Sequence, residues 1–219
     1  MTTPGKKRPA TRPTPQPAAR RIPIAGIAFG VVAAAIVAAI AFTGGGDDDT
    51  AFGSVVVSGA ALPGFTGTGA IADDPAVGAA IPSVDGADFE GTDVTIGPDS
   101  GARGILFLAH WCSHCQAEVP RVVEWLATTG GVPGVEIAAV STATDPVQVN
   151  YPPDEWLERE GWPAPVLVDD EDGTAFAAFG GTSFPYWVFV DPQGRVVART
   201  AGELDITTLE AYLTMAGGG

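Results

Sequence analysis

The stretch FLAHWCSHCQAEVP, residues 107–120, decides the fold of this 219-residue chain. It continues an apolar run that starts at Gly104 and ends at Ala109, as expected for a strand buried in the centre of a sheet. Beyond the two cysteines, apolar residues recur three and four positions apart, at Val119, Val122, Val123 and Leu126. This spacing predicts an amphipathic helix to about Thr128, bent at Pro120 because proline lacks a backbone donor. A buried strand therefore passes into a helix at the cysteines.

Cys112 and Cys115 are the only cysteines of the chain. The free N–H groups at a helix N-terminus stabilise a thiolate, which is the nucleophile of disulfide exchange. One helical turn brings the two Cα atoms within the ~4.4–6.8 Å that a disulfide requires. The spacing predicts a redox-active pair in which Cys112 attacks and Cys115 resolves. Half of a zinc site is the alternative, but one tight turn cannot easily supply four ligands from these cysteines, His110 and His114.

The pattern of the other elements predicts an α/β fold. Strands are expected at 94–96, 104–109, 135–140, 165–168, 184–191 and 195–200, with a further short strand at 55–57. Helices are expected at 113–128, 154–160 and 204–215, the last with Asp205 as a cap. Strands that alternate with helices and then end in a hairpin and a helix imply a mixed sheet with helices on both faces.

The N-terminal part predicts a membrane anchor. Residues 1–21 are basic and rich in proline, and are expected to form a disordered cytoplasmic tail. Residues 22–42 carry no charge and would span ~30 Å as a helix, which suits a transmembrane segment. Residues 43–76 are expected to be mostly a tether, and residues 77–219 a folded domain outside the cytoplasm. A cleaved signal peptide is the alternative, and it gives the same compartment.

Charge is divided unevenly along the chain. Six of the 11 basic residues fall within the first 21 positions, whereas all 26 acidic residues follow position 46. An acidic surface of this kind repels nucleic acid and anionic headgroups, so no nucleic-acid partner is expected. It serves solubility or salt adaptation, or it steers a basic partner protein.

The cysteine segment resembles the TlpA/ResA-like branch of membrane-anchored thiol-disulfide oxidoreductases in the thioredoxin superfamily. That branch carries Trp-Cys-x-x-Cys-x-x-Glu-x-Pro, which is matched by Trp111, Cys112, Cys115, Glu118 and Pro120. A second match comprises Thr182–Pro185, Val188–Asp191 and Gly194. The resemblance covers about residues 77–216, and it implies that the predicted domain at residues 77–219 has a thioredoxin-like fold. It implies protein thiol or disulfide clients, an electron partner in the membrane or outside the cytoplasm, and no cofactor.

The resemblance also implies roles for single residues. The Phe184–Pro185 bond is expected to be cis and to pack beside the disulfide, where free backbone groups pair with a client strand. A simple strand-entry proline is the alternative. Trp111 is expected to shield the site. Glu118 would take or give the Cys115 proton, unless it is an exposed glutamate paired with Arg121.

Two departures from thioredoxins affect the interpretation. Leu106 occupies the position of their buried aspartate, so Glu118 is the better candidate for a buried acid. A histidine at position 114 is associated with oxidising members of the family, because it stabilises the thiolate; a passive exposed side chain is the alternative. The TlpA-like pattern favours a reductase and His114 a disulfide donor, so the direction is open. For His110, packing or capping is favoured over catalysis.

Two other classes compete. A copper-binding module would use the thiolates and nearby histidines, but copper-delivering relatives space their cysteines three apart and add a distant histidine. No histidine follows residue 114 here. Peroxiredoxins carry a Thr-x-x-Cys loop, and this chain has no such cysteine.

Overall fold

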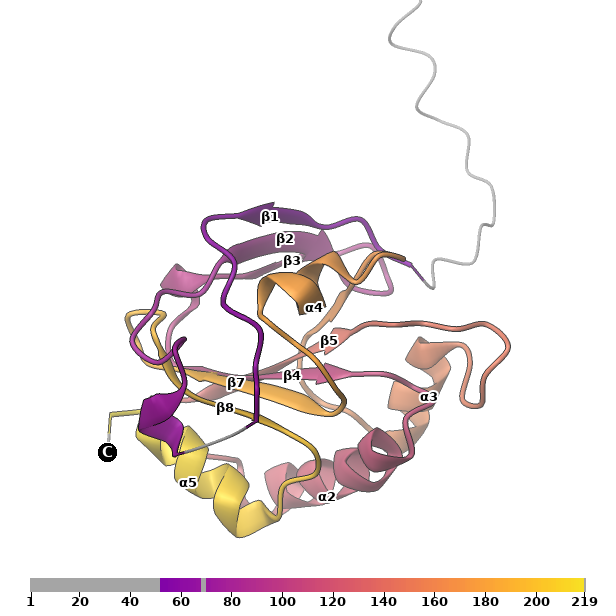
Figure 1. Cartoon of the computed structure of the whole chain (residues 1–219). Coiled ribbons are helices and arrows are strands. Elements are labelled where there is room, and N and C mark those ends of the chain that lie inside the picture. Colours follow the sequence, from indigo (N-terminus) through magenta and orange to yellow (C-terminus); the bar gives the residue numbers. More distant parts are fainter. Residues whose placement is uncertain (1–51, 68–69, 219) are drawn as a thin grey trace, which may run out of the picture. The chain divides into compact units, whose positions relative to one another are not determined.

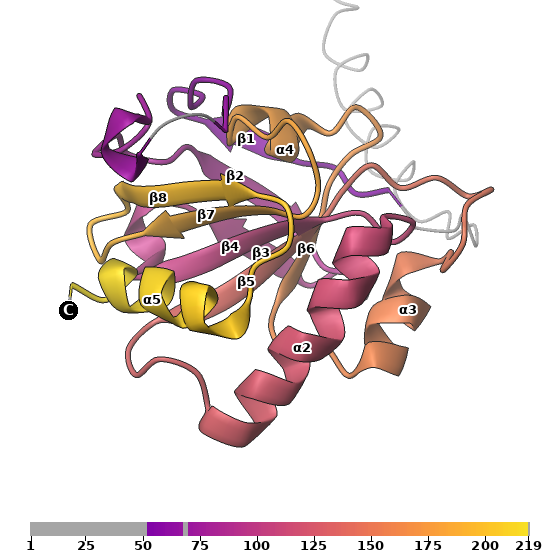
Figure 2. The same cartoon turned by 60° about the horizontal axis from the view of Figure 1, so that its bottom comes forward.

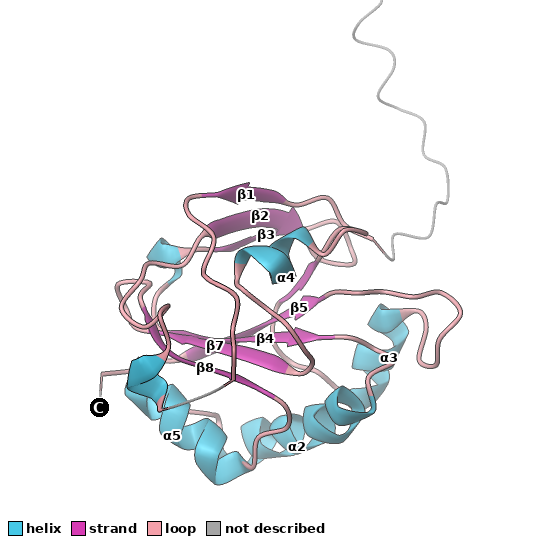
Figure 3. Ribbon diagram, in the orientation of Figure 1, coloured by secondary structure: helices cyan, strands magenta, loops and turns pink. Residues whose placement is uncertain are grey.

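The computed structural model describes residues 52–67 and 70–218. Its elements are β1 (Val56–Ser58), η1 (Ile71–Asp73), β2 (Ser83–Ala87), β3 (Asp93–Ile96), η2 (Pro98–Ser100), β4 (Arg103–Leu108), α2 (Ser113–Thr129), β5 (Glu136–Ser141), α3 (Pro153–Glu160), β6 (Val166–Val168), α4 (Thr174–Ala178), β7 (Tyr186–Val190), β8 (Val196–Ala201) and α5 (Ile206–Ala216). Figure 3 colours them by type.

A five-stranded mixed sheet forms the centre, in the order β6-β5-β4-β7-β8. β4 pairs in parallel with β5 on one side and antiparallel with β7 on the other. All residues of β4 and β7 are buried, which explains why the residues of both strands, except Arg103 at the start of β4, do not alternate between apolar and charged. The predicted mixed sheet is confirmed.

Helices cover both faces of this sheet, as predicted, and a second sheet joins them on one face. Figures 1 and 2 show α2, α3 and α5 on one side, and α4 with the three-stranded sheet β1-β2-β3 on the other. Successive β4 side chains alternate between these layers. Leu106 and Leu108 pack with the first set of helices, whereas Ile105 and Phe107 pack with α4 and the second sheet.

The segment predicted as a tether differs from that prediction in its described part. β1 pairs antiparallel with β2, and Leu62 and Ala76 are buried. The carboxylate of Asp74 forms two hydrogen bonds with the guanidinium of Arg199, one of them 2.8 Å long, and the Arg199 side chain is fully buried. The described residues from 52 onward therefore pack onto the domain.

The predicted transmembrane segment, residues 22–42, and the basic tail before it lie outside the described residues. Within residues 52–67 and 70–218, no helix has the length and apolar character needed to cross a bilayer.

Candidate active site

Cys112 lies at the junction between β4 and α2. A backbone turn from Ala109 to Cys112, closed by a 3.0 Å hydrogen bond, leads the chain from the strand into the helix, and Cys112 is the N-cap residue. Its thiol lies 3.7 Å from the carbonyl oxygen of Phe184, to which it donates. Cys112 is 9% exposed and Cys115 is fully buried, and both are free thiols in this structure. Only Cys112 presents any surface to an incoming disulfide.

Cys115 is held in its protonated form by its surroundings. Burial raises the pKa of the Cys115 thiol, and the nearby Cys112 and Glu118 side chains raise it further, against a backbone hydrogen bond of Ala109 that lowers it. A thiol of this kind reacts as a nucleophile only after a base has removed its proton. The site therefore needs a proton acceptor near Cys115.

Glu118 is a buried carboxyl one turn beyond Cys115 on α2. It is 1% exposed, and its Oε1 accepts hydrogen bonds from Trp187 Nε1 at 3.2 Å and from the Leu204 backbone at 2.9 Å. Its Oε2 is buried without a partner among the described residues. Burial raises the pKa of Glu118 to about 7, and the two hydrogen bonds oppose a further rise. The carboxyl can thus gain or lose a proton near neutral pH, and the alternative of an exposed glutamate is wrong.

Phe184 and Pro185 lie beside the cysteines at the start of β7. The Phe184–Pro185 bond is cis, as the resemblance predicts. The Phe184 ring meets the Trp111 ring edge to face, with centroids 6.1 Å apart and planes at 89°. The carbonyl oxygen of Pro185 accepts a hydrogen bond from Gly202, while that of Phe184 faces the Cys112 thiol. The two aromatic rings therefore form one apolar wall next to Cys112.

His110 and Trp111 hold the loop that follows β5. Trp111 Nε1 donates to the Ala143 carbonyl at 2.7 Å. His110 Nδ1 donates to the Val149 carbonyl at 2.7 Å, and its Nε2 accepts from the Asp145 backbone at 3.1 Å. Burial lowers the pKa of His110, and these partners fix the neutral tautomer with the proton on Nδ1. His110 is thus a packed, fully bonded residue, with no ring nitrogen available to a metal.

His114 points away from the core, and its side chain is 66% exposed. Its Nδ1 lies within hydrogen-bond distance of Glu203 Oε1, at 2.6 Å, and Arg121 forms an ion pair with the other oxygen of Glu203 at 2.7 Å. Glu203 is not among the residues predicted from the sequence, because a glutamate 89 positions from its partner carries no local signal. In the described part of the chain, no three histidine, cysteine or acidic side chains lie together so that they could hold a metal ion.

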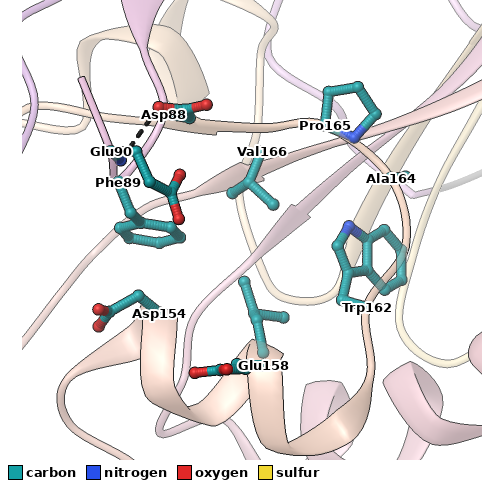
Figure 4. A pocket seen from close by; sticks show the side chains of 10 residues that line it. Asp88, Phe89, Glu90, Asp154, Glu158, Trp162, Ala164, Pro165 and Val166 are labelled. Carbon is teal, nitrogen blue, oxygen red and sulfur yellow. Dashed lines mark hydrogen bonds between the residues drawn. The ribbon is translucent and has the colours of Figure 1, made fainter. Parts of the chain in front are cut away.

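A separate hollow of about 410 Å³ lies between the β2–β3 turn, α3 and the start of β6. Figure 4 shows four carboxylates around it, with the rings of Phe89 and Trp162. The carboxylates belong to Asp88, Glu90, Asp154 and Glu158. None of the predicted site residues lines this hollow, so it is separate from the cysteine site.

Comparisons with known proteins agree with this geometry. A family model described as AhpC/TSA family matches residues 77–199, more than half of the chain. The thiol:disulfide interchange protein DsbE homolog of Paracoccus denitrificans is 30% identical over 155 residues, which cover 66% of this chain and 80% of that protein. The thiol-disulfide oxidoreductase ResA of Oceanobacillus iheyensis is 29% identical over 117 residues, covering 52% of this chain and 58% of ResA.

Among solved structures, the thio-disulfide isomerase of Thermus thermophilus aligns with a TM-score of 0.51 and 28% identity. The alignment covers 64% of this chain and 96% of that one. The family match includes the cysteine junction, Glu118 and the cis-proline together. The chain therefore belongs to the AhpC/TSA family of thioredoxin-like proteins, in which its relatives include DsbE and ResA.

Proposed function

We propose that the domain is a thiol-disulfide oxidoreductase that exchanges disulfides with protein clients through Cys112 and Cys115. The observation that carries this proposal is the contrast within the pair: Cys112 is the N-cap residue of α2 and retains 9% exposure, whereas Cys115 has none. A client disulfide would therefore meet Cys112 first, and Cys115 would meet only Cys112. The names of the relatives support the same activity.

Reduction of a client begins at Cys112. Its thiolate attacks one sulfur of the client disulfide, forms a mixed disulfide and releases the other client sulfur as a thiolate. Glu118 then takes the proton of Cys115, whose thiolate attacks the Cys112 sulfur. This second step forms the Cys112–Cys115 disulfide and releases the second client thiol. Two electrons pass from the cysteine pair to the client, and the reverse sequence donates a disulfide.

The client backbone is proposed to dock at Phe184 and Pro185. The proline carries no N–H, and the Phe184 carbonyl already faces Cys112, so an extended client segment here would place its sulfur next to the nucleophile. The Trp111 and Phe184 rings would exclude water from the mixed disulfide. The sequence Cys-Ser-His-Cys leaves the net direction open. A histidine at position 114 would stabilise the reduced pair and so favour a disulfide donor, whereas the TlpA-like pattern favours a reductase.

The proposed location is outside the cytoplasm, with residues 22–42 as a single-pass anchor in the cell membrane. The support is the sequence itself: an uncharged run between a basic tail and an acidic segment. Partners in this setting are protein thiols or disulfides and an electron carrier on the same side of the membrane. An alkaline phosphatase fused after residue 50 should be active in cells, and an inactive fusion would contradict this location.

Trapping tests the function. The Cys115→Ser variant of the full chain should accumulate mixed disulfides between Cys112 and client proteins, seen as bands that disappear on reduction. The double variant Cys112→Ser/Cys115→Ser, which has no thiol, is the matched control and should show none. Equal bands from both proteins, or none from either, would sink the proposal. A reduction potential near ~−270 mV would identify a reductase, and one between ~−120 and −180 mV a disulfide donor.

A further inference from the structure

Glu203 connects the redox motif to a second part of the chain. It lies in the short segment between β8 and α5, and its side chain is 30% exposed. One carboxylate oxygen pairs with His114 at 2.6 Å and the other with Arg121 at 2.7 Å. Both of its oxygens thus contact side chains carried by α2, the imidazole of His114 and the guanidinium of Arg121.

The contact forms part of a continuous stripe on α2. Positions 114, 118 and 121 are four and three residues apart, so they share one face of the helix. His114 and Arg121 meet Glu203, and the carboxyl of Glu118 accepts from the backbone of the next residue, Leu204. The segment 203–204 therefore contacts both the histidine between the cysteines and the buried acid.

Charge at this position bears on the redox equilibrium. Reduction can leave a negative charge on Cys112, whereas the disulfide carries none. Cations near the first turn of α2 stabilise the reduced form, and a carboxylate that engages them opposes this effect. His114 lies only two residues after Cys112. The removal of the Glu203 charge would leave His114 and Arg121 without their counter-charge.

We infer that Glu203 is a positioning residue that lowers the reduction potential of the Cys112–Cys115 pair by engaging His114 and Arg121. This inference rests on the proposed thiol-disulfide exchange. It adds a residue outside both sequence motifs to those that decide whether the protein acts as a reductase or as a disulfide donor. It also explains how a histidine at position 114 can occur in a TlpA-like motif. Glu203 would offset the rise in reduction potential that His114 causes.

The test is Glu203→Gln in the purified full-length chain. Glutamine keeps an oxygen for the hydrogen bond and removes the charge. In glutathione buffers the reduced form should be favoured about tenfold over the wild type, which corresponds to a rise of about 30 mV. Glu210→Gln is the matched control: it removes the same charge from an exposed position on α5 and should shift the equilibrium less than twofold. Equal shifts in both variants would overturn the inference.

A double variant separates an electrostatic role from a structural one. In a His114→Ala background, Glu203→Gln should shift the equilibrium by threefold or less, because one of the two side chains that Glu203 engages is already gone. An undiminished tenfold shift would exclude action through His114. Thermal unfolding identifies a purely structural role, which would lower the melting temperature and leave the potential unchanged. The equilibrium with glutathione is measured without a client protein. A failure to trap clients would therefore count against the proposed function, whereas an unchanged equilibrium in Glu203→Gln would count against this inference alone.

Discussion

Replacement of Glu118 by glutamine is the sharpest test of the buried carboxyl. Glu118 is 1% exposed, and burial raises its pKa from 4.5 to about 7. Glutamine retains an oxygen that can accept from Trp187 and Leu204, but it has no proton to release. The E118Q variant therefore removes the titration and preserves the shape of the site.

The pH dependence of the stability difference has a definite sign. Because the folded pKa lies above the unfolded value, the folded state binds more protons, and ionisation of Glu118 opposes folding. The stability conferred by the protonated carboxyl is complete below pH 4.5, declines as pH rises, and is lost above about pH 7. A rise of this size corresponds to about 3 kcal/mol. The free energy of unfolding of E118Q, relative to that of the wild type, should therefore increase by about 3 kcal/mol as the pH is raised from about 4 to about 8.

Urea unfolding under reducing conditions measures this difference. Both proteins are unfolded at a series of pH values. The contributions of the titrating groups that both proteins share then cancel in the difference between their free energies of unfolding. Glu124→Gln, on the exposed side of the same helix, is the control, and its curve should run parallel to that of the wild type. A difference between E118Q and wild type that stays constant over the whole pH range would refute the assignment of a raised pKa to Glu118.

The same variant bears on the second chemical step. A positioned general base contributes about 10²–10⁴-fold, so E118Q should slow the release of a mixed disulfide by a factor in this range. The first attack by Cys112 should keep its rate. Stopped-flow measurement with a disulfide peptide separates the two phases, and the wild-type release rate should rise with pH through about 7. An unchanged release rate would remove Glu118 from the mechanism.

Three further substitutions probe the scaffold around the site. Asp74→Asn takes the charge from the partner of the buried Arg199 and should cost about 3–5 kcal/mol in urea unfolding, and a cost below about 1 kcal/mol would contradict the buried pairing. Gly104→Ala places a Cβ 2.8 Å from a carbon of the buried Leu213 and should lower the free energy of unfolding by about 1–3 kcal/mol through overpacking. An unchanged unfolding midpoint would show that the neighbouring side chains can shift at no cost. His110→Phe should leave the Asp145 amide without its acceptor, and hydrogen exchange at that amide should rise at least tenfold, whereas unchanged protection would show that the imidazole does not hold the loop.

The central part of the fold could be predicted from local patterns. The strand β4, the helix α2 and the β7–β8 hairpin are long enough to show their periodicity or their continuous apolar character, and Asp205 caps α5 as its position indicated. Shorter elements gave no such signal. β2 has the sequence SVDGA with one fully buried residue, and α4 is only five residues long. These elements exist through contacts with distant parts of the chain.

The same division applies to the site. The cysteines, Glu118 and Pro185 stand in motifs whose spacing points to their chemistry. The burial of Glu118 could not be read from its helix, because it depends on Trp187 and Leu204, which come from β7 and the segment before α5. Predicting Glu203 would have required knowing how that segment lies against α2.

The packing of Asp74 against Arg199 has a consequence for any attempt to isolate the domain. The family match begins at residue 77, after β1, Leu62 and Asp74. A protein shortened to that boundary would keep Arg199, whose side chain is fully buried here, and would lose the carboxylate that neutralises it. It would also remove β1, so that β2 would become an edge strand with unpaired backbone groups that can pair with another copy of the protein. The unit that packs together is therefore larger than the region matched by the family model, and it includes β1.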